Sequence, residues 1–94
     1  MNKYETMFIV SLQNGEDAAK EIVEKFKNML ETQATLDSFN EWGKRRLAYP
    51  IQDLNDGFYV LAEFSAAADF PAELERNFKI TEGILRYMVI RKEV

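Results

Sequence analysis

Hydrophobic and polar residues first alternate along the chain and then take up a helical spacing. Residues 4–10 (YETMFIV) alternate, which predicts a half-buried strand. One side of this strand carries Tyr4, Thr6, Phe8 and Val10. Apolar residues then recur over residues 16–32 at the i, i+3, i+4, i+7 spacing of an amphipathic helix. The apolar side of this helix comprises Ala19, Ile22, Val23, Phe26, Met29 and Leu30.

The middle of the chain predicts a β-hairpin. Residues 35–49 have strand character, with Gly43 indicating a bulge or bend and Pro50 favouring an edge strand. The loop around residues 52–57 ends in the turn signal Asn-Asp-Gly, and residues 58–65 (FYVLAEFS) form the next strand.

A short second helix and a last strand follow. Asp69 suits an N-cap, Pro71 suits the first turn and Gly83 ends the helix. The apolar positions recur every four residues at Phe70, Leu74 and Phe78. The strand over residues 84–92 is apolar on both sides, so either side can face the helices. One side carries Leu85, Tyr87 and Val89, and the other carries Ile84, Met88 and Ile90.

The expected order is β-α-β-β-α-β within a single domain of residues 1–94. Two β-α-β units with right-handed crossovers give a four-stranded antiparallel sheet with both helices on one face. The fold class is therefore α+β, in the ferredoxin-like arrangement.

Composition narrows the chemistry that this domain can perform. The 94 residues are 47% hydrophobic, which supports one modest core. No Cys and no His are present, which excludes thiolate nucleophiles, sulfur-bound zinc and histidine-based catalysis. We expect a non-catalytic protein without a cofactor or metal. Because the sequence has no signal-peptide pattern and no apolar run of about 20 residues, we also expect a cytoplasmic location.

Charge is unevenly distributed although the formal net charge is only −4. Residues 43–51 and residues 84–92 each carry three cations and no acid, so all 16 acidic residues lie elsewhere. A local positive excess attracts a polyanion whatever the net charge is. We therefore expect RNA contacts at Lys3, Lys44, Arg45, Arg46, Arg86, Arg91 and Lys92.

Two interpretations of these basic residues stay open. On a strand, Lys44 and Arg46 point to one side and Arg45 to the other, unless Gly43 bends the chain. A projecting basic hairpin suits phosphate contacts, but basic residues on an edge strand also block edge-to-edge pairing. If the first and last strands pair, a second cluster forms from Lys3, Arg86, Arg91 and Lys92.

The uncovered sheet face is expected to bind a partner protein. Such a face is polar when nothing covers it, yet here it is expected to carry Met7, Ile9, Tyr59 and Leu61. The alternative is that these are single surface apolar residues, which are common. Trp42 and Tyr49 could stack on bases, although packing at the base of the hairpin is favoured over stacking.

Residues 43–51 (GKRRLAYPI) resemble the signature of the bacterial small-subunit ribosomal protein S6 family. Tyr4-Glu5, residues 57–59 (GFY) and residues 86–88 (RYM) fit the same family in the same order. The resemblance implies a ferredoxin-like domain that joins the small ribosomal subunit. It also implies binding to the central domain of the small-subunit rRNA as a heterodimer with ribosomal protein S18. The positions that match the motif one by one are Gly43, Arg45, Leu47, Ala48, Tyr49 and Ile51.

Two other functions fit the same topology. An RRM-like single-strand RNA binder needs aromatic and basic residues on the two central strands, where Tyr59 is the one expected aromatic. An acylphosphatase-like enzyme needs an anion-cradling loop after the first strand, and residues 11–15 (SLQNG) offer no arginine there.

Overall fold

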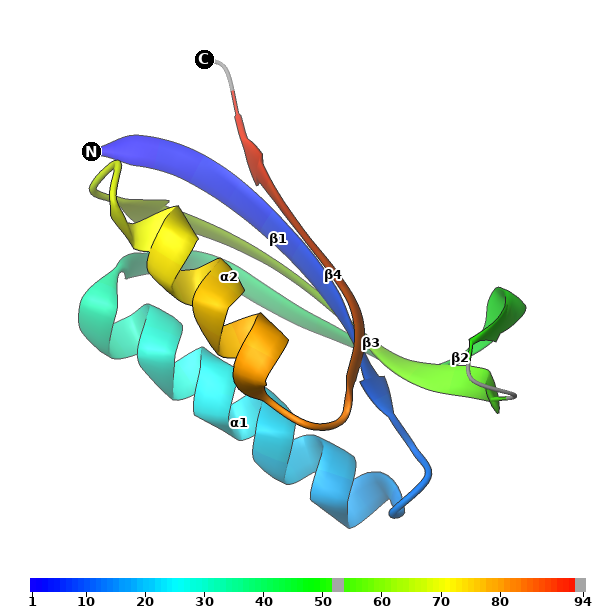
Figure 1. Cartoon of the computed structure of the whole chain (residues 1–94). Coiled ribbons are helices and arrows are strands. Elements are labelled where there is room, and N and C mark those ends of the chain that lie inside the picture. Colours follow the sequence, from blue (N-terminus) through cyan, green and yellow to red (C-terminus); the bar gives the residue numbers. More distant parts are fainter. Residues whose placement is uncertain (52–53, 93–94) are drawn as a thin grey trace.

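The computed structural model describes residues 1–51 and 54–92, and it has the expected order of elements (Figure 1). The elements are β1 (Asn2–Ser11), α1 (Glu16–Gln33), β2 (Thr35–Ile51), β3 (Leu54–Ala66), α2 (Phe70–Ile80) and β4 (Ile84–Arg91). Among the described residues, neither helix has the length and apolar character needed to span a bilayer.

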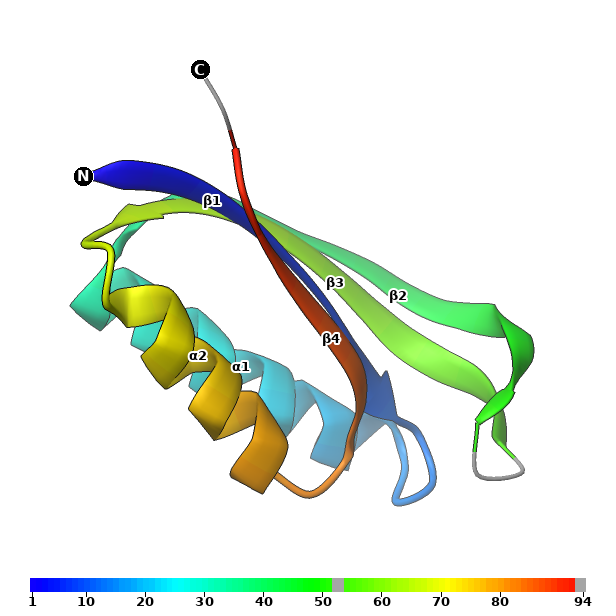
Figure 2. The ribbon, with the colours of Figure 1, turned by 45° about the horizontal axis from the view of Figure 1, so that its top comes forward.

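The four strands form one antiparallel sheet in the order β2-β3-β1-β4. Both helices lie against the same face of this sheet, so the opposite face has no helical cover (Figures 1 and 2). The ferredoxin-like prediction is therefore confirmed. β2 is an edge strand, as the proline near its end predicts, and β4 is the other edge.

Aromatic rings fill the space between the helices and the sheet. Phe8 of β1 lies 5.5 Å from Phe26 of α1 and 5.1 Å from Phe78 of α2, measured between ring centroids. Phe26 and Phe78 stack at 4.5 Å. All three side chains are at most 2% exposed. The alternation in β1 and the helical spacing in α1 and α2 thus predicted the core correctly.

The contacts of β4 decide which of its two apolar sides faces the core. Tyr87 stacks on Phe78 with 5.1 Å between ring centroids, so Tyr87 faces the helices. Met88 and Ile90 point the other way and are 44% and 45% exposed. A register shift between Ile9 and Val10 lets Ile84 pack against the core as well. Neither of the two sides expected from simple alternation is therefore correct over the whole strand.

The β2–β3 hairpin is longer than the sequence predicts. β3 begins at Leu54 rather than Phe58, and Arg46 pairs with Asp56 while Arg45 pairs with Gly57. The prediction of a turn at Asn55-Asp56-Gly57 is therefore wrong. Gly57 lies within the strand, where the side chain of Ile9 leaves no room for a Cβ. Figure 2 shows the hairpin extending past β1 and β4.

The start of α2 differs in one detail from the expected capping. Asp69 occupies the N-cap position and a proline follows in the first turn, as predicted. The Asp69 side chain, however, makes no capping hydrogen bond. α2 ends at Ile80, and Gly83 takes a positive φ of 97° in the connection to β4.

Candidate nucleic-acid interface

The part of the hairpin that carries the first basic cluster is here called the basic arm (residues 44–51 and 54–57). It begins where β2 bends, because a register shift separates Glu41 from Gly43 and the φ of Gly43 is +79°. Beyond the bend, Lys44, Arg45 and Arg46 pair in sequence with Phe58, Gly57 and Asp56 of β3. The strand alternation therefore continues through the three cations, as the sequence predicts.

The three cations of the basic arm are all exposed. Lys44 Nζ lies 3.9 Å from a carboxylate oxygen of Asp56, in an ion pair whose side chains are 58% and 43% exposed. Arg45 Nη1 donates a hydrogen bond to the carbonyl of Lys44 at 3.2 Å. Exposed pairs of this kind are weak, so these contacts leave the cations available to a polyanion.

A second group of cations lies at the opposite end of the sheet, where both chain ends are found (Figure 1). We call it the terminal cluster, and it consists of Lys3, Arg91 and Lys92. The backbone N–H of Lys92 donates to the carbonyl of Lys3 at 2.9 Å, which extends the pairing of β1 with β4. Lys92 Nζ lies 3.2 Å from Glu63, and Arg91 donates to the Asn2 side chain at 3.2 Å.

Arg86 does not belong to the terminal cluster, so the expected single second cluster is wrong. Arg86 pairs with Ile9, whereas Arg91 pairs with Tyr4. The two arginines are five positions apart on the strand, or about 17 Å at roughly 3.4 Å per residue. Arg86 is therefore nearer to the basic arm along the strands, although it lies on the opposite edge of the sheet.

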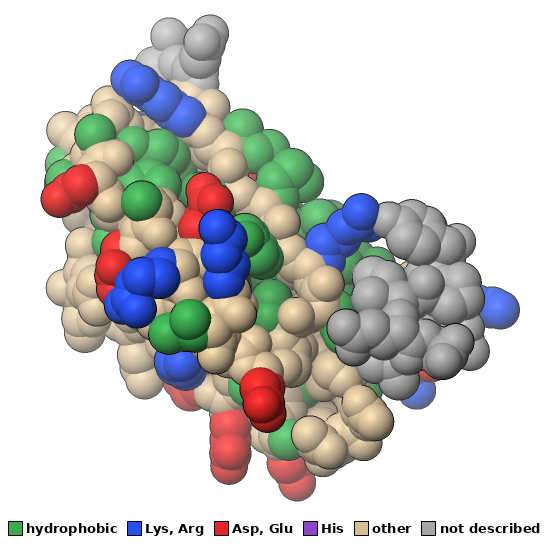
Figure 3. Space-filling view, in the orientation of Figure 1, with side chains coloured by type: hydrophobic (Ala, Val, Ile, Leu, Met, Phe, Trp, Pro, Cys, Tyr) green, Lys and Arg blue, Asp and Glu red, His purple; other side chains and the backbone are tan. Residues whose placement is uncertain are grey.

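The uncovered sheet face has an apolar middle. Leu61 pairs with Met7, which in turn pairs with Met88, so these three residues form one row across β3, β1 and β4. Leu61 and Met7 are partly exposed. Thr6 Oγ1 donates to the Met88 carbonyl at 2.9 Å, a contact across the pairing of β1 with β4. In Figure 3, hydrophobic side chains follow the β4 edge, with basic side chains at both ends of that run.

Two of the four expected partner-surface residues need comment. Ile9 is only 3% exposed, so it cannot contribute directly to an open surface, and that expectation is wrong. Tyr59 is partly exposed and pairs with Ile9 on β1 and Gly43 on β2. Met88 and Ile90 instead extend the apolar surface, and sequence reasoning missed them because both sides of β4 are apolar.

Trp42 lies in the bulge at the base of the basic arm. It is 47% exposed, so about half of its surface is covered and the rest is open to solvent. An exposed ring beside a basic segment is suited to stacking on a base. The side chain of Tyr49, the other aromatic considered for this role, lies outside the described residues.

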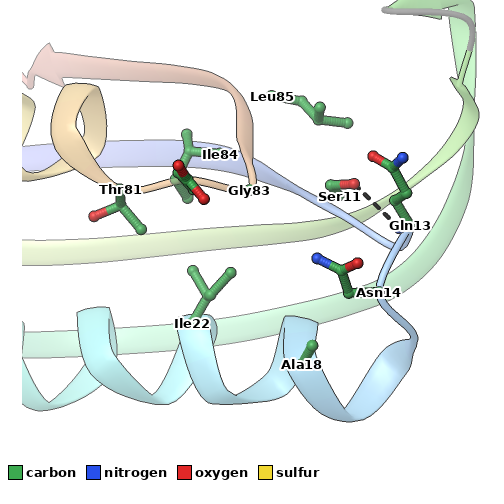
Figure 4. A pocket seen from close by; sticks show the side chains of 10 residues that line it. Ser11, Gln13, Asn14, Ala18, Ile22, Thr81, Gly83, Ile84 and Leu85 are labelled. Carbon is green, nitrogen blue, oxygen red and sulfur yellow. Dashed lines mark hydrogen bonds between the residues drawn. The ribbon is translucent and has the colours of Figure 1, made fainter.

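A hollow of about 530 Å³ lies between the β1–α1 and α2–β4 connections (Figure 4). Ser11 Oγ accepts a hydrogen bond from the backbone N–H of Gln13 at 3.1 Å within it. The residues that line it are Ser11, Gln13, Asn14, Ala18, Ile22, Thr81, Glu82, Gly83, Ile84 and Leu85. They include one carboxylate and no Lys or Arg.

One further cation, Arg76, lies on α2, away from the basic arm and the terminal cluster. Arg76 binds Glu73 through two hydrogen bonds of 3.0 and 2.6 Å. These bonds hold the pKa of Glu73 below its ordinary value of 4.5. Within residues 1–51 and 54–92, the acidic side chains form no group that could hold a metal ion.

Comparison with known proteins decides the family. The family model described as "Ribosomal protein S6" matches residues 3–91, which is nearly the whole chain. This chain belongs to the ribosomal protein S6 family. The S6 relatives include the small ribosomal subunit protein bS6 of Alkaliphilus oremlandii, which is 45% identical over 99% of both chains. The bS6 protein of Caldanaerobacter subterraneus is 46% identical over the same shares.

A solved S6 structure shares the fold. The 30S ribosomal protein S6 of Thermotoga maritima superposes with a TM-score of 0.89 at 29% identity. The superposition covers 97% of this chain and 87% of the Thermotoga chain. The S6 resemblance expected from residues 43–51 is therefore confirmed by sequence and by structure.

Proposed function

We propose that this protein is a structural component of the small ribosomal subunit, in the cytoplasm. It binds the central domain of the small-subunit rRNA together with ribosomal protein S18, as a heterodimer and without catalysis. The observation that carries this proposal is the layout of the sheet: the apolar middle of its uncovered face lies between two basic ends, the basic arm and the terminal cluster.

The RNA contacts are assigned to the two basic ends. Lys44, Arg45 and Arg46 are exposed on the basic arm, which extends past the sheet and can reach a phosphate backbone (Figure 2). Lys3, Arg86, Arg91 and Lys92 give further exposed positive charge on β1 and β4. Outside the basic segments the chain carries more acidic than basic residues, which predicts weak RNA affinity for the isolated protein.

The partner protein is assigned to the apolar middle of the same face, which consists of Met7, Tyr59, Leu61, Met88 and Ile90. Covering these side chains removes apolar area from water. A basic partner on this surface would supply phosphate neutralisation that this chain lacks. The RRM-like alternative is not favoured, because β1 and β3 present one aromatic on the uncovered face, Tyr59, together with Glu5 and Glu63.

A filter-binding titration tests the RNA part of the proposal. We expect a fragment of the rRNA central domain to bind weakly to the isolated protein and at least tenfold more tightly when ribosomal protein S18 is added. Tight binding by the isolated protein, unchanged by that partner, would contradict the proposal. Loss of binding by Tyr59→Ala alone would favour the RRM-like alternative.

Calorimetric titration with ribosomal protein S18 tests the partner surface. Met88→Glu places a charge in the apolar middle at a position that is already 44% exposed, so the fold should persist. We expect heterodimer affinity to fall at least tenfold. Ile80→Glu is the matched control, because Ile80 is 63% exposed at the end of α2, away from this face. Equal affinity of the two variants for ribosomal protein S18 would show that the partner does not bind at the apolar middle.

A further inference from the structure

Leu47 is buried although it lies in the basic arm. It is 7% exposed, whereas Lys44, Arg45 and Arg46 directly before it are exposed. Ile9 of β1 is similarly unexpected, since it is 3% exposed on the sheet face that carries no helix. Two aliphatic side chains are therefore covered where neither helix covers them.

Gly57 lies between these two side chains. It pairs with Arg45 on β2 and with Ser11 on β1, so it is located where the basic arm leaves the sheet. A Cβ on Gly57 would overlap Cγ2 of Ile9 and would lie 3.4 Å from Cδ2 of Leu47. Both side chains thus occupy the space that a side chain at position 57 would need. Because the φ of Gly57 is not positive, the glycine is required here for space and not for backbone conformation.

We propose that Leu47, packed with Ile9 over Gly57, is a positioning residue that fixes the direction of the basic arm. A two-stranded ribbon is marginally stable by itself, and it needs such an anchor to hold one orientation. The Lys44–Asp56 pair at 3.9 Å is too exposed to supply that anchor. This inference rests on the proposed function, since an arm held in place presents Arg45 and Arg46 to RNA without a further cost of ordering.

Backbone dynamics of the free protein test the anchor directly. In Leu47→Ala, we expect the heteronuclear NOE of the Arg45, Arg46 and Asp56 amides to fall, while those of β1 and both helices stay unchanged. Leu47→Met should restore the wild-type values. Val23→Ala is the control, because Val23 is 1% exposed in α1 and its truncation destabilises the core without touching the arm. Wild-type arm dynamics in Leu47→Ala, or equal loosening in Val23→Ala, would overturn the proposal.

RNA binding gives a second readout that simple loss of stability would not reproduce. With the rRNA fragment and ribosomal protein S18, we expect Leu47→Ala to bind about tenfold more weakly than the wild type. The slope of log Kd against log salt should stay the same, because no cation has been removed. Arg45→Gln/Arg46→Gln should instead lower that slope, by about 2.

These outcomes separate the anchor from the proposed function. A loosened arm with unchanged RNA affinity in Leu47→Ala, while the arginine variant binds weakly, overturns the positioning role alone. Unchanged affinity in both variants removes the arm from RNA binding, and the proposed function then fails at this site. Gly57→Ala perturbs the anchor from the opposite strand, and a wild-type arm in that variant also counts against the proposal.

Discussion

The basic arm and the terminal cluster contain similar side chains but differ in the contacts that these side chains make. Among the described residues, the cations of the basic arm make one long ion pair of 3.9 Å and one hydrogen bond to a backbone carbonyl. In the terminal cluster, Lys92 lies 3.2 Å from Glu63 and Arg91 donates to Asn2 at 3.2 Å. By number of cations alone the two regions are alike, since each contains three. Each region has one ion pair within the described part of the chain, and the pair in the basic arm is the longer and the more exposed, so we expect the basic arm to contribute more to the proposed RNA binding.

The largest expected effect comes from removing two arginines from the basic arm. Charge-assisted hydrogen bonds contribute about 1.5–3 kcal/mol each, so Arg45→Gln/Arg46→Gln should weaken binding of the rRNA fragment by at least about 100-fold. Filter binding at two salt concentrations measures the loss. Lys20→Gln/Lys79→Gln removes the same charge from exposed helix positions and serves as the control. Equal losses in the two double variants would mean that net charge, and not the arm, governs binding.

Removing charge from the terminal cluster should have a smaller effect. Arg91→Gln/Lys92→Gln is expected to weaken binding of the same fragment only about threefold, because both side chains already have partners within the protein and each contributes less than a full phosphate contact. The same filter-binding assay applies. A loss as large as that of the arm variant would reverse the ranking of the two regions.

Freeing Lys92 from its ion pair with Glu63 should make the terminal cluster bind RNA more strongly. Glu63→Gln removes the acid beside Lys92 and leaves every cation in place. We expect RNA affinity to rise about twofold and the salt slope to become steeper, as one more cation contacts phosphate. Chemical denaturation should show a change in the free energy of unfolding of less than about 1 kcal/mol, since the pair is 41% exposed on both sides. Weaker RNA binding by Glu63→Gln would show that this ion pair orders the terminal cluster for RNA.

Arg76 is more firmly paired than any cation of the basic arm or the terminal cluster, because it makes two hydrogen bonds to Glu73. Replacing Arg76 should therefore leave RNA affinity unchanged. Its effect should appear in stability instead. Because the pKa of Glu73 is lowered in the folded state, chiefly by the hydrogen bond from Arg76, the pair stabilises the fold above the ordinary glutamate pKa of 4.5. That contribution is lost as the pH falls through the lowered value. Denaturation curves of the wild type and Arg76→Gln should therefore differ at pH 7 and converge once the pH is below the lowered pKa of Glu73.

Much of the fold is predictable from sequence because apolar residues recur at the spacing of a strand or of a helix in most of the elements. Alternation in β1 and the i, i+3, i+4 spacing in α1 each specify a buried side, and the core rings Phe8, Phe26 and Phe78 all follow from them. β4 does not specify a side. Its orientation depends on the stacking of Tyr87 on Phe78, a contact between segments that no local pattern contains.

The candidate site was predictable as a set of residue types but not as an arrangement. The cations of residues 44–46 are neighbours in sequence and therefore remain neighbours in space. Arg86 and Arg91 are also close in sequence, yet an extended strand separates them along its length. The burial of Ile9 escaped prediction because its close approach to Gly57 is a contact between two strands, which no local pattern contains.

The central place of β1 in the sheet has a consequence for how the chain folds during synthesis. β1 is made before its two partners, because it pairs with β3 and β4, which come later in the sequence. At about 5–20 residues per second, roughly 4–16 s pass between the synthesis of Ser11 and that of Arg91. During that time the apolar side of β1 lacks its complete set of neighbours. Folding of this domain is therefore tied to β4, which is made after the domain's other strands and helices, and a nascent chain stopped before β4 should stay dependent on chaperones.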